Sequence, residues 1–458
     1  MNRRNFLTAM LGTSVLAALP RLSFGEPTPG TPFWINIQAA GAWDPALLFD
    51  PKPNLRGRLA SETFLLYGVP TLTGPSGTGT ISAPSSNALR STPGGGIPYL
   101  GFADLHGDPT NPLHPYKCFL PTYYDRVTII NGVDTGTVNH DVGARYCASG
   151  SLNEGYPCFA SQVAAANGSE RALSFLNMGG YDETAGIITA SRLDGKGLPS
   201  LLRLMGPNDL SGDNQGSDVL LAQRSLDRVL AAHAQRVMRL RSSQRLPEHR
   251  RGLDSLAQAE SGVANLQGMR FNANDQGQKN LLAIGIDAFR RGIATSMNVL
   301  CPSFDSHDNN EQTQAAAVYN LFETLRTLLI ETETPSSGSA PVPAVLVVTS
   351  DFGRSPYYRN AGTDHWSVGS VMIIQNTLAK SLGLGLPTNR VIGGTTGGNE
   401  NVALRPLRVN PSTLALDASG IVITPGHVLR ALRRLAKIDS SPRIAAFPLS
   451  VDRDLAIG

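Results

Sequence analysis

The sequence places acidic and histidine residues in short clusters beside candidate strands. Residues 304–310 read Phe-Asp-Ser-His-Asp-Asn-Asn, residues 351–354 read Asp-Phe-Gly-Arg, and residues 364–366 read Asp-His-Trp. Carboxylates and imidazoles together suit zinc, manganese or magnesium, and two such ions can clamp a tetrahedral oxyanion. These clusters therefore predict a site for divalent metal, with one or two ions.

Five residues are the candidate metal ligands, and several have a competing structural role. Asp44 and Asp305 could instead form turns or helix caps. Asp305 and His307 are two positions apart, which places both on one side of an extended segment. Local hydrogen bonding is the alternative for Asp351, whereas His365 has no evident packing role. The predicted ligands are Asp44, Asp305, His307, Asp351 and His365.

Two further residues are the candidate catalytic groups. His140 follows the second candidate strand, and Arg354 lies three positions after Asp351. Either side chain can stabilise charge that develops on a transferred group. Arg354 fits an ion pair with Asp351 or Asp364 equally well.

These clusters need a sheet that brings strand ends together, and five short apolar segments are typical of strands. The segments are residues 33–38, 126–131, 296–301, 344–349 and 368–374. Amphipathic helices are predicted over 308–331 and 428–437. The pattern predicts an α/β fold with a largely parallel sheet covered by helices on both faces. In such sheets, ligands collect beyond the carboxyl ends of the strands.

Two segments interrupt this α/β pattern. Residues 69–98 are rich in glycine, serine, threonine and proline, and we expect a loop insertion there. Residues 217–269 carry apolar side chains at helical spacing, which predicts a helical hairpin laid on the sheet or over the site. With these insertions, one α/β domain is predicted over residues 26–458.

Residues 1–25 have the three parts of an export signal. Arg3 and Arg4 precede Phe6 and an apolar stretch, and small residues precede a cleavage position. This order resembles the twin-arginine signal, with an ordinary secretory signal as the alternative. We therefore expect a periplasmic or secreted protein that engages the twin-arginine export machinery. No later stretch predicts a stable membrane anchor.

Charge and cysteine content exclude further classes. The 458 residues carry a formal net charge of +3, and only 16% are charged. Without a basic run, neither nucleic-acid binding nor attachment to anionic lipid is expected. The four cysteines include no Cys-x-x-Cys pair, so a zinc ribbon is not predicted. Cys147 and Cys158 either close a short loop or remain buried thiols.

Three of these segments resemble a known family. Residues 349–356 (Thr-Ser-Asp-Phe-Gly-Arg-Ser-Pro) and 362–366 (Gly-Thr-Asp-His-Trp) resemble the T-E-F-G-R-T-P and G-R-D-H-W signature of the bacterial domain-of-unknown-function family 1501. Residues 304–310 resemble its W-D-T-H-x-N segment, and the loop with Asp44 resembles its G-G-x-D-G segment. That family is similar in fold to the alkaline phosphatase and sulfatase superfamily, whose enzymes hold two metals and hydrolyse phosphate or sulfate esters.

The resemblance implies an alkaline-phosphatase-like fold and an exported metal-dependent hydrolase of phosphate or related esters, acting on a small ester substrate. His140 occupies the position of the superfamily's nucleophilic serine. The Cys-x-Pro-x-Arg or Ser-x-Pro-x-Arg segment of sulfatases is missing, which makes a sulfatase the weaker expectation. The absent hydroxyl leaves a second hypothesis: a catalytically inactive superfamily member that binds a ligand or assembles at the cell surface.

Overall fold

The computed structural model describes residues 30–52, 55, 71–74, 77–80, 89–100, 119–169, 171, 173–193, 208, 218–247, 249–250, 252–254, 277–308, 310–335, 338–359, 362–398 and 401–457. The predicted export signal lies outside these residues. Two compact units are present. One comprises Gly30–Ser169, Phe175–Arg192 and Thr295–Gly458, and the other includes Glu170–Ser174 and Leu193–Ala294.

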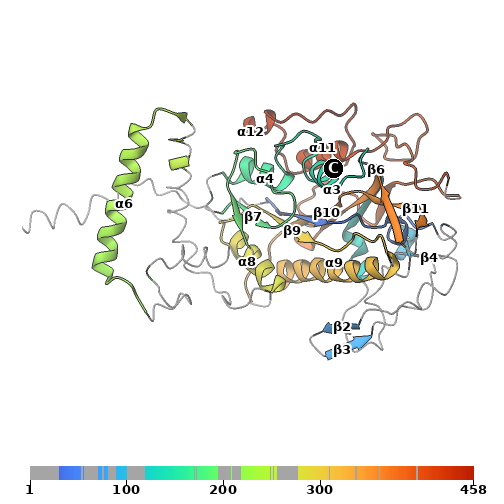
Figure 1. Cartoon of the computed structure of the whole chain (residues 1–458), viewed down its shortest axis with the longest axis horizontal. Helices are drawn as coiled ribbons and strands as arrows, with labels where there is room; N and C mark the ends of the chain where they lie inside the picture. The colour runs from blue at the N-terminus through green and yellow to red at the C-terminus, as the bar shows by residue number, and fades with distance from the viewer. Residues whose placement is uncertain are drawn as a thin grey trace, which may run out of the picture. The chain divides into compact units, whose positions relative to one another are not determined.

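An eight-stranded sheet lies at the centre of the first unit (Figure 1). The five predicted strands are confirmed within it. In order across the sheet, the strands are β14 (Arg390–Gly393), β6 (Val127–Asp134), β13 (Val368–Gln375), β10 (Ala344–Ser350), β1 (Phe33–Ala39), β9 (Ser296–Cys301), β7 (Phe175–Met178) and β8 (Ala190–Arg192). Neighbouring strands are parallel except for the two antiparallel pairs that β13 makes with β10 and β6.

Helices cover both faces of this sheet. Helix α9 (Asn310–Glu333) lies on one side, and α3 (His140–Ser149), α4 (Phe159–Asn167) and α11 (Pro425–Leu435) lie on the other (Figure 1). Strand β10 is buried along its whole length because side chains on both of its faces are covered. The predicted apolar face of α9 is buried; it consists of Val318, Leu321, Phe322, Leu325, Leu328 and Leu329. The predicted α/β class is therefore confirmed.

The hydrophobic core on the α3, α4 and α11 side joins the sheet to its helices. Trp34 of β1 and Val345 of β10 lie in one buried cluster with Phe159 of α4 and Leu432 of α11. The ring of Trp34 meets Phe159 edge-on, with centroids 5.3 Å apart. Complete burial of such side chains contributes roughly 1.5 to 3 kcal/mol each. This core holds β1 and β10 in place, and polar loops begin at the carboxyl ends of these strands.

A short ribbon explains the reversed direction of β13. Strands β11 (Gly353–Arg359) and β12 (Gly362–Trp366) come between β10 and β13 in the sequence and pair with each other in an antiparallel ribbon. The chain leaves β10 at its carboxyl end, passes through the ribbon and re-enters the sheet at the same edge. Residues that precede β13 consequently lie beside residues that follow the parallel strands.

The remaining described elements are short or lie in the second unit. The short helices are η1 (Pro45–Leu47), η4 (Pro93–Gly95), α2 (Phe119–Tyr123), η6 (Tyr124–Arg126), α10 (Thr377–Ser381) and α12 (Pro442–Ala445). The segment 69–98, predicted as a loop, instead contains β2 (Thr71–Gly74) paired with β3 (Gly77–Thr80). It also contains β4 (Leu89–Ser91), which pairs with β5 (Pro98–Leu100) at the end of the segment. These brief antiparallel pairs need little apolar sequence, which explains why composition alone indicated a loop.

The second unit contains α6 (Gln223–Ser243) and α8 (Gln278–Arg290). Most of the second arm of the predicted hairpin lies outside the described residues. Of the helices in the described ranges, none is long and apolar enough to cross a membrane. Cys147, Cys158 and Cys301 are buried free thiols. Of the two alternatives predicted for Cys147 and Cys158, a disulfide or buried thiols, the structure therefore shows buried thiols.

Candidate metal centre

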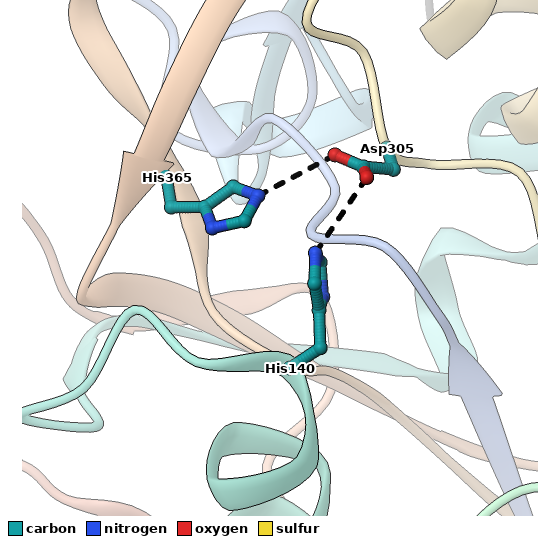
Figure 2. Close-up of side chains that lie close together, drawn as sticks. All are labelled: His140, Asp305 and His365. Atoms are coloured by element: carbon teal, nitrogen blue, oxygen red, sulfur yellow. Dashed lines mark ion pairs between the residues drawn. The ribbon is translucent and has the colours of Figure 1, made fainter.

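Three loops bring histidine and aspartate side chains together at the carboxyl edge of the sheet. His140 begins α3 after β6, Asp305 and His307 follow β9, and His365 lies in β12 just before β13. Figure 2 shows the Asp305 carboxylate between two rings, with one oxygen toward His365 and the other toward His140. We call His140, Asp305, His307 and His365 the histidine–aspartate cluster.

The spacing of the donor atoms in this cluster suits a metal ion. Asp305 Oδ1 lies 3.1 Å from His307 Nε2 and 3.5 Å from His365 Nε2, and the two Nε2 atoms are 3.0 Å apart. Donors that share one tetrahedral zinc ion at about 2.0 to 2.1 Å are about 3.3 Å from one another. On the other side, His140 Nε2 is 3.7 Å from Asp305 Oδ2. Ligand atoms of His140, Asp305 and His365 all lie within 4.8 Å of one another.

The ring of His140 is oriented by Asp351. The buried Asp351 carboxylate accepts hydrogen bonds from Gln38 Nε2 (2.8 Å) and the Gly41 backbone N–H (2.9 Å). Its Oδ2 also lies 2.8 Å from His140 Nδ1, which must donate because a carboxylate accepts. Nε2 therefore carries the lone pair in the neutral ring, and this buried atom has no hydrogen-bond partner among the described residues. A cation would satisfy it, so the residues fit a metal.

The other two histidines are oriented in the same way. His365 Nδ1 lies 2.9 Å from the Val138 carbonyl oxygen, which can only accept, so the lone pair is on Nε2. His307 Nδ1 lies 3.5 Å from Asp364 Oδ1. All three imidazoles turn Nε2 toward Asp305, and His140 and His365 each have a hydrogen-bond acceptor at Nδ1, the arrangement that outer partners impose on metal-binding histidines.

Arg354 sets the charge state of Asp305. Burial raises the pKa of Asp305, but the hydrogen bond and charge of Arg354 outweigh it, with smaller contributions from His307 and His140. The pKa of Asp305 therefore lies below its ordinary value of 3.8, and the carboxylate is ionised at neutral pH. For His365, burial lowers the pKa, and the charges of His140 and Arg354 lower it further. The His365 ring is therefore neutral at neutral pH, as a metal ligand must be.

The guanidinium of Arg354 is fully buried and occupied by the loops it joins. Its Nε donates to the Ala42 carbonyl (2.9 Å), its Nη1 to the Thr363 carbonyl (3.1 Å), and its Nη2 to Asp305 Oδ1 (2.5 Å). Nη2 also donates to the carbonyls of Gly41 and Phe304. Of the predicted roles, the structure places Arg354 in an ion pair, but with Asp305 rather than with Asp351 or Asp364.

Asp44 lies in a second, closed group of polar residues. It caps η1 through the Ala46 N–H (3.1 Å), accepts from Asn310 Nδ2 (3.1 Å), and is completely buried. Its backbone N–H donates to Gln314 Oε1 (3.0 Å). Asn310 Oδ1 accepts from the Ser306 and Thr363 hydroxyls. We call Asp44, Ser306, Asn310, Gln314 and Thr363 the loop network.

The structure thus separates the seven predicted site residues by position. His140, Asp305, His307 and His365 meet in the cluster, Asp351 lies behind His140, Arg354 holds Asp305, and Asp44 belongs to the loop network.

Sequence reasoning missed two partners of Asp351. Gln38 is one of two polar residues in the otherwise apolar strand β1, the other being Asn36, and this was the available signal for it. Gly41 has φ +108°, and a Cβ there would collide with the backbone of Asp305, so only glycine permits this approach.

Comparison with known proteins finds one family model that matches part of the chain. Residues 200–376 match the family described as "Protein of unknown function (DUF1501)", which confirms the resemblance carried by the motifs at 304–310 and 349–366. Asp305, His307 and His365 lie within the matched range, whereas His140 lies before it. No curated protein matches the chain.

Proposed function

We propose that the protein is a metal-dependent hydrolase of phosphate or related esters whose metal is held by the histidine–aspartate cluster. The observation that carries the proposal is the set of three imidazoles whose Nε2 atoms face one ionised carboxylate, two of them held at Nδ1 by hydrogen bonds. Zinc and manganese suit this nitrogen-rich set better than magnesium, which prefers oxygen ligands. The cluster supports one ion, and a second is not required.

The openness of the cluster supports catalysis over a purely structural metal. The side chains of Asp305 and His307 are 48% and 49% exposed, so solvent and a small ester can reach the donor atoms. Solvent access of this kind is typical of catalytic metal sites, which keep a ligand position open, rather than of closed structural sites. When bound, the ion would supply a Lewis acid for a phosphoryl oxygen.

The first turn of α3 supports an anionic substrate. His140 is the first residue of this helix, and Asn139 caps it by accepting from the Val142 N–H at 3.1 Å. The positive end of the helix dipole therefore lies at the cluster, where it attracts a phosphate group. Two residues act through others: Asp351 orients His140, and Arg354 keeps Asp305 ionised and in place.

The direct test measures metal content and hydrolysis together. The purified chain is stripped with a chelator, reloaded with zinc, manganese or magnesium, and assayed on 4-nitrophenyl phosphate and bis(4-nitrophenyl) phosphate. We expect hydrolysis that requires metal and falls more than about 100-fold in Asp305→Ala and His365→Ala, since loss of a ligand exceeds the effect of losing an outer partner. His249→Gln, at an exposed histidine of the second unit, is the control and should retain activity.

Two results would count against this proposal. If the wild-type protein binds stoichiometric metal but hydrolyses no phosphate or sulfate ester in a broad panel, the ligand-binding or assembly role becomes the better account. If it binds no metal, the cluster is not a metal centre and the hydrolase proposal fails.

We also propose that the protein is exported in folded form by the twin-arginine machinery to the periplasm or beyond. Arg3, Arg4 and Phe6, which lie outside the described residues, support this proposal. Replacing both arginines with lysine should leave the precursor in the cytoplasm. Unchanged export would indicate the general secretory route.

A further inference from the structure

Helix α6 concentrates positive charge in a chain that is close to neutral. Its 21 residues include five arginines (224, 228, 236, 239 and 241) and one acidic residue, Asp227. The helix therefore carries more net positive charge than the formal +3 of the entire chain. A charge balance over the whole chain does not reveal this segment, because its arginines are spaced along the helix and form no continuous basic run.

Among the described residues, most of these arginines form no ion pair. Arg241 Nε pairs with Asp254 at 2.5 Å, and Asp227 accepts from Gln223 Nε2 at 2.9 Å. Within the part of the chain that the structure describes, Arg224, Arg228, Arg236 and Arg239 make no ion pair. Unpaired arginines along one helix produce a local positive potential that attracts anionic groups.

The same helix has an apolar stripe that is largely uncovered. Leu226, Val229, Leu230, Val237 and Leu240 recur at helical spacing. Val229, Leu230 and Leu240 are 54%, 50% and 39% exposed, whereas Val237 is buried. Exposed aliphatic side chains that recur along one helix typically mark an interaction surface.

We propose that α6 binds peripherally to a membrane surface rich in anionic phospholipid. The aliphatic stripe would enter the boundary between headgroups and acyl chains, and the arginines would contact lipid phosphates. A helix of this length extends about 31 Å, and with five arginines it lies along the bilayer. Nucleic acid also attracts arginines, but its phosphate backbone has no use for an exposed aliphatic stripe, so lipid is the better match.

This inference is independent of the proposed hydrolase function. It concerns only α6, which lies outside the unit that contains the histidine–aspartate cluster. Loss of lipid binding and loss of hydrolysis can therefore be measured separately in the same variants.

Vesicle sedimentation tests the proposal with the full chain. Vesicles of equal parts phosphatidylglycerol and phosphatidylcholine are compared with vesicles of phosphatidylcholine alone, at low and at high salt. We expect at least about tenfold stronger binding to the anionic vesicles, and high salt should weaken this binding because it screens the attraction between arginines and lipid phosphates.

Two pairs of substitutions separate charge from apolar contact. Arg228→Gln with Arg239→Gln should weaken binding to anionic vesicles, and Val229→Ser with Leu230→Ser should do so at unchanged charge. The matched control is Arg443→Gln with Arg453→Gln, which removes the same charge from exposed positions outside α6 and should bind like wild type.

Three outcomes would overturn the proposal. Equal binding to both vesicle types shows that lipid charge is not recognised. A control variant as defective as the α6 variants shows that only overall charge matters. If Val229→Ser with Leu230→Ser lowers the thermal unfolding midpoint by several degrees, the stripe is covered by the folded chain itself and is not a lipid-binding surface.

Discussion

The histidine–aspartate cluster and the loop network occupy the same loops but differ in how their polar atoms are satisfied. In the loop network, Asp44, Asn310 and Gln314 hydrogen-bond to one another or to neighbouring loop atoms, and all three are buried. In the cluster, His140 Nε2 has no hydrogen-bond partner within the described residues, and Asp305 is half exposed. The loop network thus fixes the shape of the loops through its hydrogen bonds, whereas the histidine–aspartate cluster keeps lone pairs that can act as ligands.

The largest expected effect tests the histidine–aspartate cluster alone. In His307→Ala, metal affinity should fall more than about 100-fold, because one of the donors is lost. The free energy of unfolding of the metal-free protein should change by less than about 0.5 kcal/mol, because this side chain is half exposed. Calorimetric metal titration and chemical denaturation measure the two quantities. A large loss of stability in the metal-free state would instead show that His307, like the residues of the loop network, has a structural role.

The opposite pattern is expected for Asp44→Ala. This change leaves the Ala46 N–H and Asn310 Nδ2 without their buried acceptor, at a cost of roughly 2 to 4 kcal/mol for two unsatisfied donors. Metal affinity of the folded variant should stay within a few-fold of wild type. Denaturation and metal titration under conditions where the variant is folded provide the check. Loss of metal binding as severe as in His307→Ala would restore Asp44 as a ligand.

A smaller effect is expected for Asp351, which lies behind His140. Asp351→Asn introduces an amide that cannot accept from Gln38, Gly41 and His140 together, so the His140 ring loses its orientation. Metal affinity should fall about 10- to 100-fold, the usual cost of losing such a partner. Asp452→Asn is the control, because Asp452 holds a different histidine, His427, at 2.8 Å. Equal effects of both substitutions would show a general loss of stability.

The smallest effect is a pH dependence of the metal-free protein. Folding lowers the pKa of Asp305 below its ordinary value of 3.8. The pairing of this carboxylate with Arg354 therefore stabilises the fold at pH values above 3.8. This contribution is lost as pH falls through the lowered pKa. The difference in unfolding free energy between wild type and Asp305→Asn should therefore shrink on acidification. It should be small throughout, since solvent screens this half-exposed pair. A difference that grows at low pH would contradict the assignment.

Much of the fold could be predicted because its elements are strongly patterned. The five apolar segments form five consecutive strands of the sheet, and α9 begins two residues after its predicted start. Their apolar periodicity reflects burial, which sequence reports directly. The pairs β2–β3 and β4–β5 were not predicted, because such short strands leave almost no periodic signal.

The candidate site was less predictable, because residue type does not reveal direction. Asp44 and Asp305 both follow parallel strands, yet one points into the loop network and the other into the cluster. The convergence of His365 was expected from strand ends in a parallel sheet, but a residue before a parallel strand would lie at the far edge. It meets the cluster because β13 is antiparallel, which periodicity alone does not indicate.

The ribbon that reverses β13 also has a consequence for the order of folding. Residues 344–375 fold back on themselves, so the pairing of β10 with β13 joins positions close in the chain. By contrast, Ala39 of β1 pairs with Ser350 of β10 across 311 positions. Local pairing forms faster than distant closure, so we expect β1 to dock after β10 and β13 have paired. That late step delivers Gln38 and Gly41 to Asp351, and the capacity to bind metal should therefore appear only when the fold is complete.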